Sequence, residues 1–105
     1  LHSTLYPYAS VLINFDPGVV SVSLSAGDYG EDADSLHVTA YSELNADGDA
    51  VAYELKVLPE NEGGCLEFNL AADNIRSVVV FAQSSKGTSD NNTIFTDNLR
   101  FCRRL

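Results

Sequence analysis

The sequence contains no tryptophan, no methionine, two cysteines and few basic residues. It also has no apolar run near the roughly 20 residues that a membrane-spanning helix needs, so we expect no membrane insertion. Six basic residues stand against 15 acidic ones, which leaves little positive surface to neutralise phosphate groups. This balance argues against nucleic-acid binding and against attachment to anionic membranes, whereas divalent cations and neutral polymers are compatible with it.

Short alternations of apolar and polar residues, separated by turn residues, run along most of the chain. A period of two places successive side chains on opposite faces of a strand, and no ten-residue segment shows a convincing helical period. The pattern predicts about seven strands, at residues 10–15, 19–25, 35–43, 50–58, 65–70, 75–83 and around Asp97.

Turn residues support these divisions. Asp16-Pro17-Gly18 predicts a turn between the first two strands, and residues 45–49 predict a hairpin loop between the third and fourth. A chain of 105 residues suits one domain with a modest core. We therefore predict a single all-β domain over residues 1–105, built as an antiparallel β-sandwich.

The segment 50–58 alternates most clearly. Glu54 and Lys56 fall on its polar side. Its apolar side, in which we expect Tyr53 to contribute to the core, consists of Val51, Tyr53, Leu55 and Val57.

One carboxylate of the last predicted strand lies on the apolar parity. Asp97 falls between Phe95 and Leu99, and Phe101 follows on the same side. Either a bulge turns Asp97 outward, or the carboxylate enters the core and needs a cation or hydrogen-bond donors. We expect a largely buried Asp97 with an identifiable partner, which is a calcium ion, backbone donors or Arg76.

A second group of carboxylates lies between the second and third predicted strands. Calcium prefers several oxygen ligands from a flexible loop, so these side chains are candidate metal ligands together with Asp97. Their spacing does not match an EF-hand loop. The alternative is a solvated acidic turn that keeps the protein soluble. The candidates in this loop are Asp28, Glu31, Asp32 and Asp34.

Tyrosines are the rings available for sugar binding in a chain without tryptophan. Tyr29 lies inside the acidic loop, and Tyr41 lies on the polar parity of its strand. We expect these two to bind ligand if a sugar platform exists. The alternative is that they are amphipathic side chains at strand ends and edges.

The two cysteines, Cys65 and Cys102, lie at strand ends and on the polar parity of their strands. Adjacent strands would bring them together, and an exported protein would permit their oxidation, so they are candidates for a disulfide. If the strands belong to different parts of the fold, or if the protein is cytosolic, two thiols remain.

An ordered set of segments resembles a group of secreted bacterial jelly-roll modules found in proteins with sorting tails of the PEP-CTERM type, which are distantly similar to carbohydrate-binding modules. The segments that carry the resemblance are residues 14–24, 36–41, 47–48, 75–78 and 96–101.

This resemblance implies a jelly-roll β-sandwich in an extracellular or cell-surface protein. In the carbohydrate-binding relatives an Asp on the closing strand helps to hold a structural calcium ion, and Asp97 is the matching position. Such modules have further strands before the Phe-Asp-Pro segment, whereas residues 1–8 alone precede the first predicted strand here. We therefore expect N-terminal strands of the family, and the carboxylates they supply, to be missing.

Signatures of catalysis are weak in this sequence. His2 and His37 lack the spacing of a zinc site, the serines form no nucleophile elbow, and the carboxylates that glycoside hydrolysis would need lie in loops. We expect no enzyme. The sequence favours a non-catalytic binding or adhesion module of an exported protein, which binds a polysaccharide or surface glycan and holds a structural calcium ion.

The alternative is a structural or assembly module without a small ligand, in which a second copy covers an open sheet edge to form a homodimer. A hydrolase is the third possibility. Exposed rings around a concave face would indicate binding, while a large apolar patch without such a face would indicate assembly.

Overall fold

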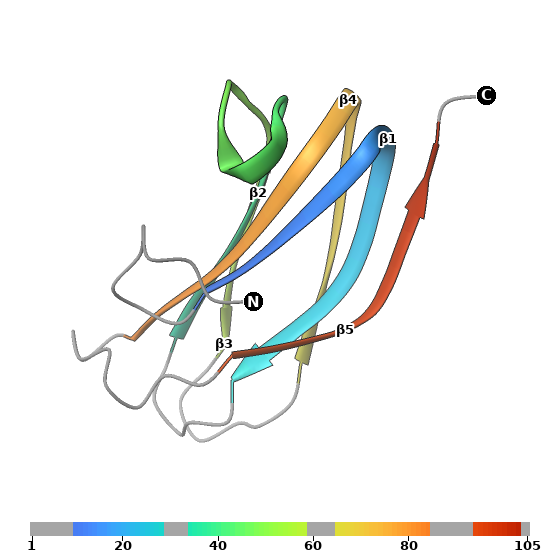
Figure 1. Ribbon diagram of the computed structural model, residues 1–105. Coiled ribbons are helices and arrows are strands. Elements are labelled where there is room, and N and C mark those ends of the chain that lie inside the picture. The colour runs from blue at the N-terminus through green and yellow to red at the C-terminus, as the bar shows by residue number, and fades with distance from the viewer. Residues whose placement is uncertain (1–9, 29–33, 59–64, 85–93, 104–105) are drawn as a thin grey trace.

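The computed structural model describes residues 10–28, 34–58, 65–84 and 94–103. These residues form one antiparallel sheet with the strand order β3-β2-β4-β1-β5 (Figure 1). No helix among them is long and apolar enough to cross a membrane. The elements are β1 (Ser10–Asp28), β2 (Asp34–Tyr41), the 3₁₀ turn η1 (Leu44–Ala46), β3 (Ala50–Leu58), β4 (Cys65–Ser84) and β5 (Ile94–Cys102).

The predicted all-β antiparallel class is confirmed, but the described residues form five strands instead of about seven. Residues 10–15 and 19–25 belong to one strand, β1, although Asp16-Pro17-Gly18 was expected to end the first of them. Residues 65–70 and 75–83 likewise join in β4. The predicted turn is a bend within β1, and β4 follows β1 around it, with the ladder interrupted between Asn14 and Val19.

The bend divides the sheet into two arms. In the first arm residues 10–14 of β1 pair with residues 77–81 of β4, and in the second arm residues 21–27 pair with residues 65–71. The register shifts between these runs, as expected where one strand bulges to turn a corner. In Figure 1, β1 and β4 rise together to the bend and then return. β2 and β3 continue the first arm, and β5 continues the second.

The two long strands approach each other closely at the bend. A Cβ atom on Gly18 would run into the Asn74 side chain and would lie 3.1 Å from the Ile75 carbonyl oxygen. Glycine therefore suits the position because it leaves room for the opposite strand. The Arg76 guanidinium spans the outside of the bend, 3.1 Å from Asp16 Oδ1 and 3.7 Å from Glu43 Oε1.

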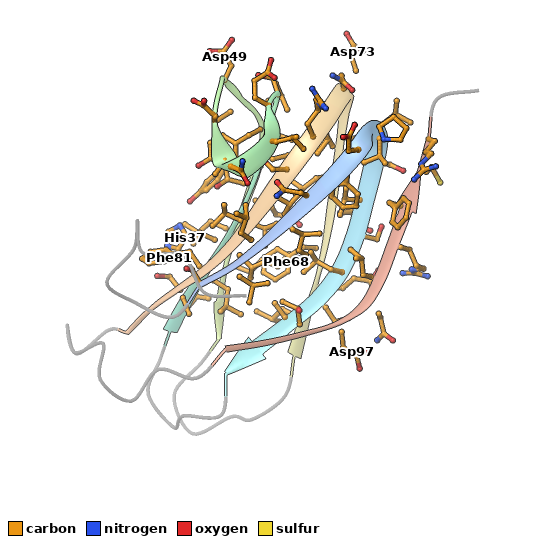
Figure 2. All side chains as sticks on the ribbon, viewed as in Figure 1. His37, Asp49, Phe68, Asp73, Phe81 and Asp97 are labelled. Atoms are coloured by element: carbon orange, nitrogen blue, oxygen red, sulfur yellow. The ribbon has the colours of Figure 1, made fainter. Side chains whose placement is uncertain are left out.

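A single hydrophobic cluster joins the arms. Alternate side chains of β1, β2 and β4 point to the inside of the bend and are almost completely buried. Phe68, the largest of them, lies inside the bend in Figure 2. The sheet therefore buries its inner surface against itself. The second arm contributes Val22, Leu24, Phe68 and Leu70, and the first arm contributes Leu36, Val38, Val78 and Val80.

The loop that precedes β3 closes over the bent end of the first arm. Ser77 is completely buried there. Its Oγ accepts a hydrogen bond from the Ala46 backbone N–H (2.9 Å) and donates one to the Glu43 carbonyl oxygen (2.6 Å). Asn14 adds two bonds to Asn45, through its side-chain oxygen and its amide nitrogen. The expected hairpin loop is present, with Gly48 at a positive φ of 74°.

Replacing Ser77 with alanine should destabilise the protein by about 1–3 kcal/mol, because the Ala46 N–H and the Glu43 carbonyl would lose the partner that the buried Ser77 hydroxyl gives them. Ser23→Ala is the matched control, since its Oγ bonds Asn69 Oδ1 at 2.7 Å in a solvent-accessible position where water can replace it. That control should change stability by less than about 0.5 kcal/mol. Urea unfolding of both variants measures the difference, and equal losses would contradict the structural role of Ser77.

Candidate functional site

The surface of the first arm that faces away from the core is largely apolar. We call it the outer face, and it comprises the odd-numbered residues from 35 to 41 in β2, from 51 to 57 in β3 and from 77 to 81 in β4, which lie side by side in the register. Ser77 and Val79 of this face are buried, its residues on β2 and Phe81 are half-buried, and its residues on β3 are exposed. None of these described residues is Asp, Glu, Lys or Arg. On β3 its side chains are between 38% and 60% exposed, and they are Val51, Tyr53, Leu55 and Val57.

The exposure of β3 overturns the expectation that Tyr53 and its apolar neighbours pack in the core. β3 pairs with β2 so that Lys56 lies beside Leu36 and Glu54 lies beside Val38. Because Leu36 and Val38 are fully buried, the charged side of β3 points inward and the apolar side points to solvent. The physical reason lies in what Glu54 and Lys56 contact.

Glu54 and Lys56 connect the outer strand of the first arm to the second arm. Lys56 Nζ donates to the Glu67 carbonyl oxygen at 2.6 Å, and Glu54 Oε1 accepts from the Asn69 backbone N–H at 3.0 Å. Lys56 Nζ also lies 5.4 Å from the centre of the Phe68 ring, a cation–π distance. These side chains bond to backbone groups at the edge of β4 that faces away from β1 and that no other described strand covers, so they hold the two arms together.

His37 lies at the centre of the outer face, beside Phe81 (Figure 2). Its Nδ1 is 2.6 Å from the Tyr53 hydroxyl, and its Nε2 is 3.2 Å from Ser35 Oγ. The rings of His37 and Phe81 are 5.6 Å apart. Partial burial lowers the pKa of His37 below its ordinary value of 6.5, because the apolar surroundings disfavour the charged imidazolium.

Asp97 is exposed, so the expectation of a largely buried carboxylate is wrong. The other possibility, a bulge, is present: Ser23 pairs with Arg100 but Ser25 pairs with Asp97, which leaves one extra residue on β5. Asn98 takes a positive φ of 54° there. The bulge turns Asp97 away from the core side, as Figure 2 shows, and its Oδ1 accepts the Asn98 N–H at 2.8 Å.

The other candidate metal ligands do not form a site within the described part of the chain. Glu31 and Asp32 lie outside the described residues, and Asp28 and Asp34 end β1 and begin β2 at one end of the sheet. The described residues contain no group of three or more His, Cys, Asp or Glu placed to hold a metal ion. Calcium binding therefore stays a prediction for the acidic loop.

Neither of the two tyrosines predicted from the sequence to bind a sugar is the exposed ring of the outer face. Tyr29 lies outside the described residues, and Tyr41 is half-buried at the end of β2. Tyr53 is the exposed one, and sequence parity had placed it in the core. The signal that could have revealed it is the Glu54–Lys56 pair, since two long charged side chains can reach an unpaired strand edge.

The predicted disulfide is not formed. Cys102 is a free, exposed cysteine. It pairs with Ser21 of β1, whereas Cys65 pairs with Gly27. Six residues of β1 separate these partners, about 20 Å along a strand, and Cα atoms more than about 7 Å apart cannot be bridged without moving the backbone. The parity of the two cysteines carries no information about their positions along β1, and these positions keep the two residues apart.

The described residues enclose no pocket. Comparison with known proteins finds no family model, no curated protein and no solved structure that matches this chain. The outer face is therefore the candidate functional surface, and its own chemistry must indicate what it binds.

The bulge on β5 gives a first prediction for this region. Asn98→Ala should destabilise the protein by about 1–2 kcal/mol. The Cβ of alanine disfavours the left-handed backbone at this position, and alanine has no polar side chain to stabilise it through a local hydrogen bond. Asn98→Gly should leave stability within about 0.5 kcal/mol of the original, since glycine adopts this φ freely. Chemical unfolding of the pair tests the bulge, and equal effects would mean that residue 98 has an ordinary strand conformation.

His37 gives a pH prediction. Its lowered pKa means that the folded state binds fewer protons than the unfolded state just below pH 6.5. The free energy of unfolding therefore rises with pH through this window, and it falls as the pH drops from 6.5 toward the folded pKa. His37→Gln should remove this component while the other titrating groups stay. Urea unfolding between pH 7.5 and about 5 compares the slopes, and parallel profiles would contradict the role of His37.

Proposed function

We propose that this chain is a non-catalytic interaction module that binds a protein surface through its outer face. The observation that carries the proposal is the row of four large apolar side chains that β3 presents to solvent. Scattered exposed apolar residues are normal in folded proteins, whereas a contiguous apolar patch marks an interaction site. This favours the assembly alternative of the sequence analysis over catalysis.

The chemistry of the outer face suits a protein partner better than a small ligand. Its described residues carry no charged carboxylate, ammonium or guanidinium group that would orient a polar ligand. Branched aliphatic side chains flank its rings, and the described residues enclose no pocket to bury a small molecule. Removal of this apolar surface from water, at about 25 cal/mol per Å², would supply the binding energy.

We also propose that the bent sheet is a β-sandwich of jelly-roll type. The shared hydrophobic cluster of the two arms supports this, because each arm covers the other as the two sheets of a sandwich do. The bonds from Glu54 and Lys56 to β4 support it as well, since they link the facing arms at one side. Counting the halves of β1 and β4 separately would restore the seven predicted segments.

A second candidate is the glycan-binding module of an exported protein with a structural calcium ion. The exposed ring of Tyr53 favours it, because a flat ring beside a hydrogen-bonding His37 can stack on a sugar. Any calcium in this candidate would be held at the loop between β1 and β2. The aliphatic neighbours of Tyr53 fit a protein partner better, so we place this function second.

A photo-reactive amino acid at position 55 tests the proposal in the cells that make the protein. Leu55 is 47% exposed on the outer face, and Leu99, which is 42% exposed on β5, is the matched control position. Irradiation should give protein adducts at position 55 and few at position 99, because only the first position lies within the proposed binding surface. Mass spectrometry then identifies what is attached.

The outcomes separate the candidates. Protein adducts confined to position 55 support the interaction module. Carbohydrate adducts at that position would instead favour the glycan-binding candidate. Equal labelling at positions 55 and 99, or none at either, would overturn the proposal that the outer face is a specific binding surface.

A further inference from the structure

We infer that the chain binds an extended segment of another protein by strand addition, at the edge of β1 between Val11 and Asn14. The inference goes beyond the proposed function, because it uses a different surface from the outer face. Four features carry it: the unpaired edge of β1, the absence of a device that protects this edge among its described residues, the apolar side chains along it, and the charge of the whole chain.

In the first arm, β1 is the last of the described strands. β4 pairs with residues 10–14 on one side, whereas β5 pairs with β1 only between Ser21 and Asp28, in the second arm. On the other side of residues 10–14 the described sheet has no strand. Alternate residues of an edge strand direct both their N–H and their C=O away from the neighbouring strand. The partner that satisfies such a row of backbone groups is another strand.

This edge differs from the other edges of the described sheet, which are protected. Glu54 and Lys56 turn inward on β3 and bond the open edge of β4, and a bulge interrupts β5 at Asn98. Residues 11–14 include no charged residue and no proline, and their register with β4 is unbroken. Inward charges, proline and bulges are the devices that prevent strand addition, so β1 is the edge that allows it.

The side chains of this run are those of a strand covered on both faces. Val11, Leu12 and Ile13 follow one another, so both faces of β1 are apolar here. All three are only half-buried, and Asn14 is exposed, whereas Ser10 at the start of the run is already buried. Val11 and Ile13 pack against the hydrophobic cluster. An added strand would set its own side chains beside them and remove more of this apolar surface from water.

Charge and space determine which kind of strand fits. The chain has a formal net charge of −9, so two copies repel each other and a basic segment is attracted. A second copy would also bring its own second arm to the inner side of its β1. β5 of the first copy already reaches that side, since the Phe101 ring lies 5.2 Å from the Phe15 ring. A single extended segment, apolar at alternate positions and basic between them, has no such obstacle.

A short synthetic peptide of alternating valine and lysine tests strand addition directly. Its backbone is N-methylated at alternate residues, so that one edge keeps its hydrogen-bonding groups and the peptide cannot stack into fibrils. At millimolar concentration it should shift the amide signals of residues 11–14 in the isotope-labelled chain. It should also slow their hydrogen exchange several-fold, because their outward N–H groups gain acceptors. The control peptide is N-methylated at every residue, which keeps the side chains and obstructs both edges.

Two lysine substitutions separate this edge from the outer face. Leu12→Lys places a charge on the edge strand and repels the lysines of the peptide, so the shifts at residues 11–14 should fall several-fold. Leu55→Lys, on the outer face, should leave these shifts unchanged. Urea unfolding verifies that both variants fold, and the comparison of the two peptides on the original chain tests the inference without either variant.

The outcomes separate this inference from the proposed function. An absence of shifts at residues 11–14, or equal shifts with the fully methylated peptide, would overturn strand addition. Shifts at these residues that grow with protein concentration in the absence of peptide would identify a second copy as the occupant and overturn the foreign segment. Shifts confined to residues 51–57 would overturn the edge and support the outer face, so the two proposals fail separately.

Discussion

The whole structure depends on β1 and β4 staying paired while they turn through one bend. Strands that separated at Asp16-Pro17-Gly18 would leave backbone groups to be satisfied elsewhere, whereas a shared bend keeps most of the ladder intact. The bend brings the inner faces of the two arms together, so Phe68 of one arm and Val80 of the other enter one cluster. A hydrophobic core is thus formed from a single sheet.

The same bend also determines which side of β3 is buried. β3 is the outermost strand of the first arm, and it comes close to the part of β4 that no other described strand covers on that side. Glu54 and Lys56 satisfy two backbone groups of that part, so they must face inward. Since a strand has two faces, Tyr53 and Leu55 must then face solvent. The exposed apolar surface follows from hydrogen-bond satisfaction at a strand edge, and local alternation alone predicts the opposite.

Local sequence therefore predicted the positions of strands but not their environments. The segment 50–58 matches β3 in its bounds, because alternation and the preceding Asp47-Gly48 loop are local signals. The side buried, the bulge at Asn98 and the separation of Cys65 from Cys102 depend on which strand lies beside which, and alternation does not contain that information. The candidate site was missed for the same reason: its residues were recognised as apolar and then assigned to the core.

The contrast between edges and face is the strongest physical argument about function. Unpaired strand edges aggregate readily, and inward charges on β3 and a bulge on β5 protect two edges of this sheet among the described residues. One or two charged side chains are enough to protect a sheet face from association with other proteins, and β3 has four outward positions that could carry them. All four carry Val, Tyr or Leu. Because selection for solubility alone would favour charge there, the uncharged face of an otherwise acidic chain supports the proposed contact with an apolar partner surface.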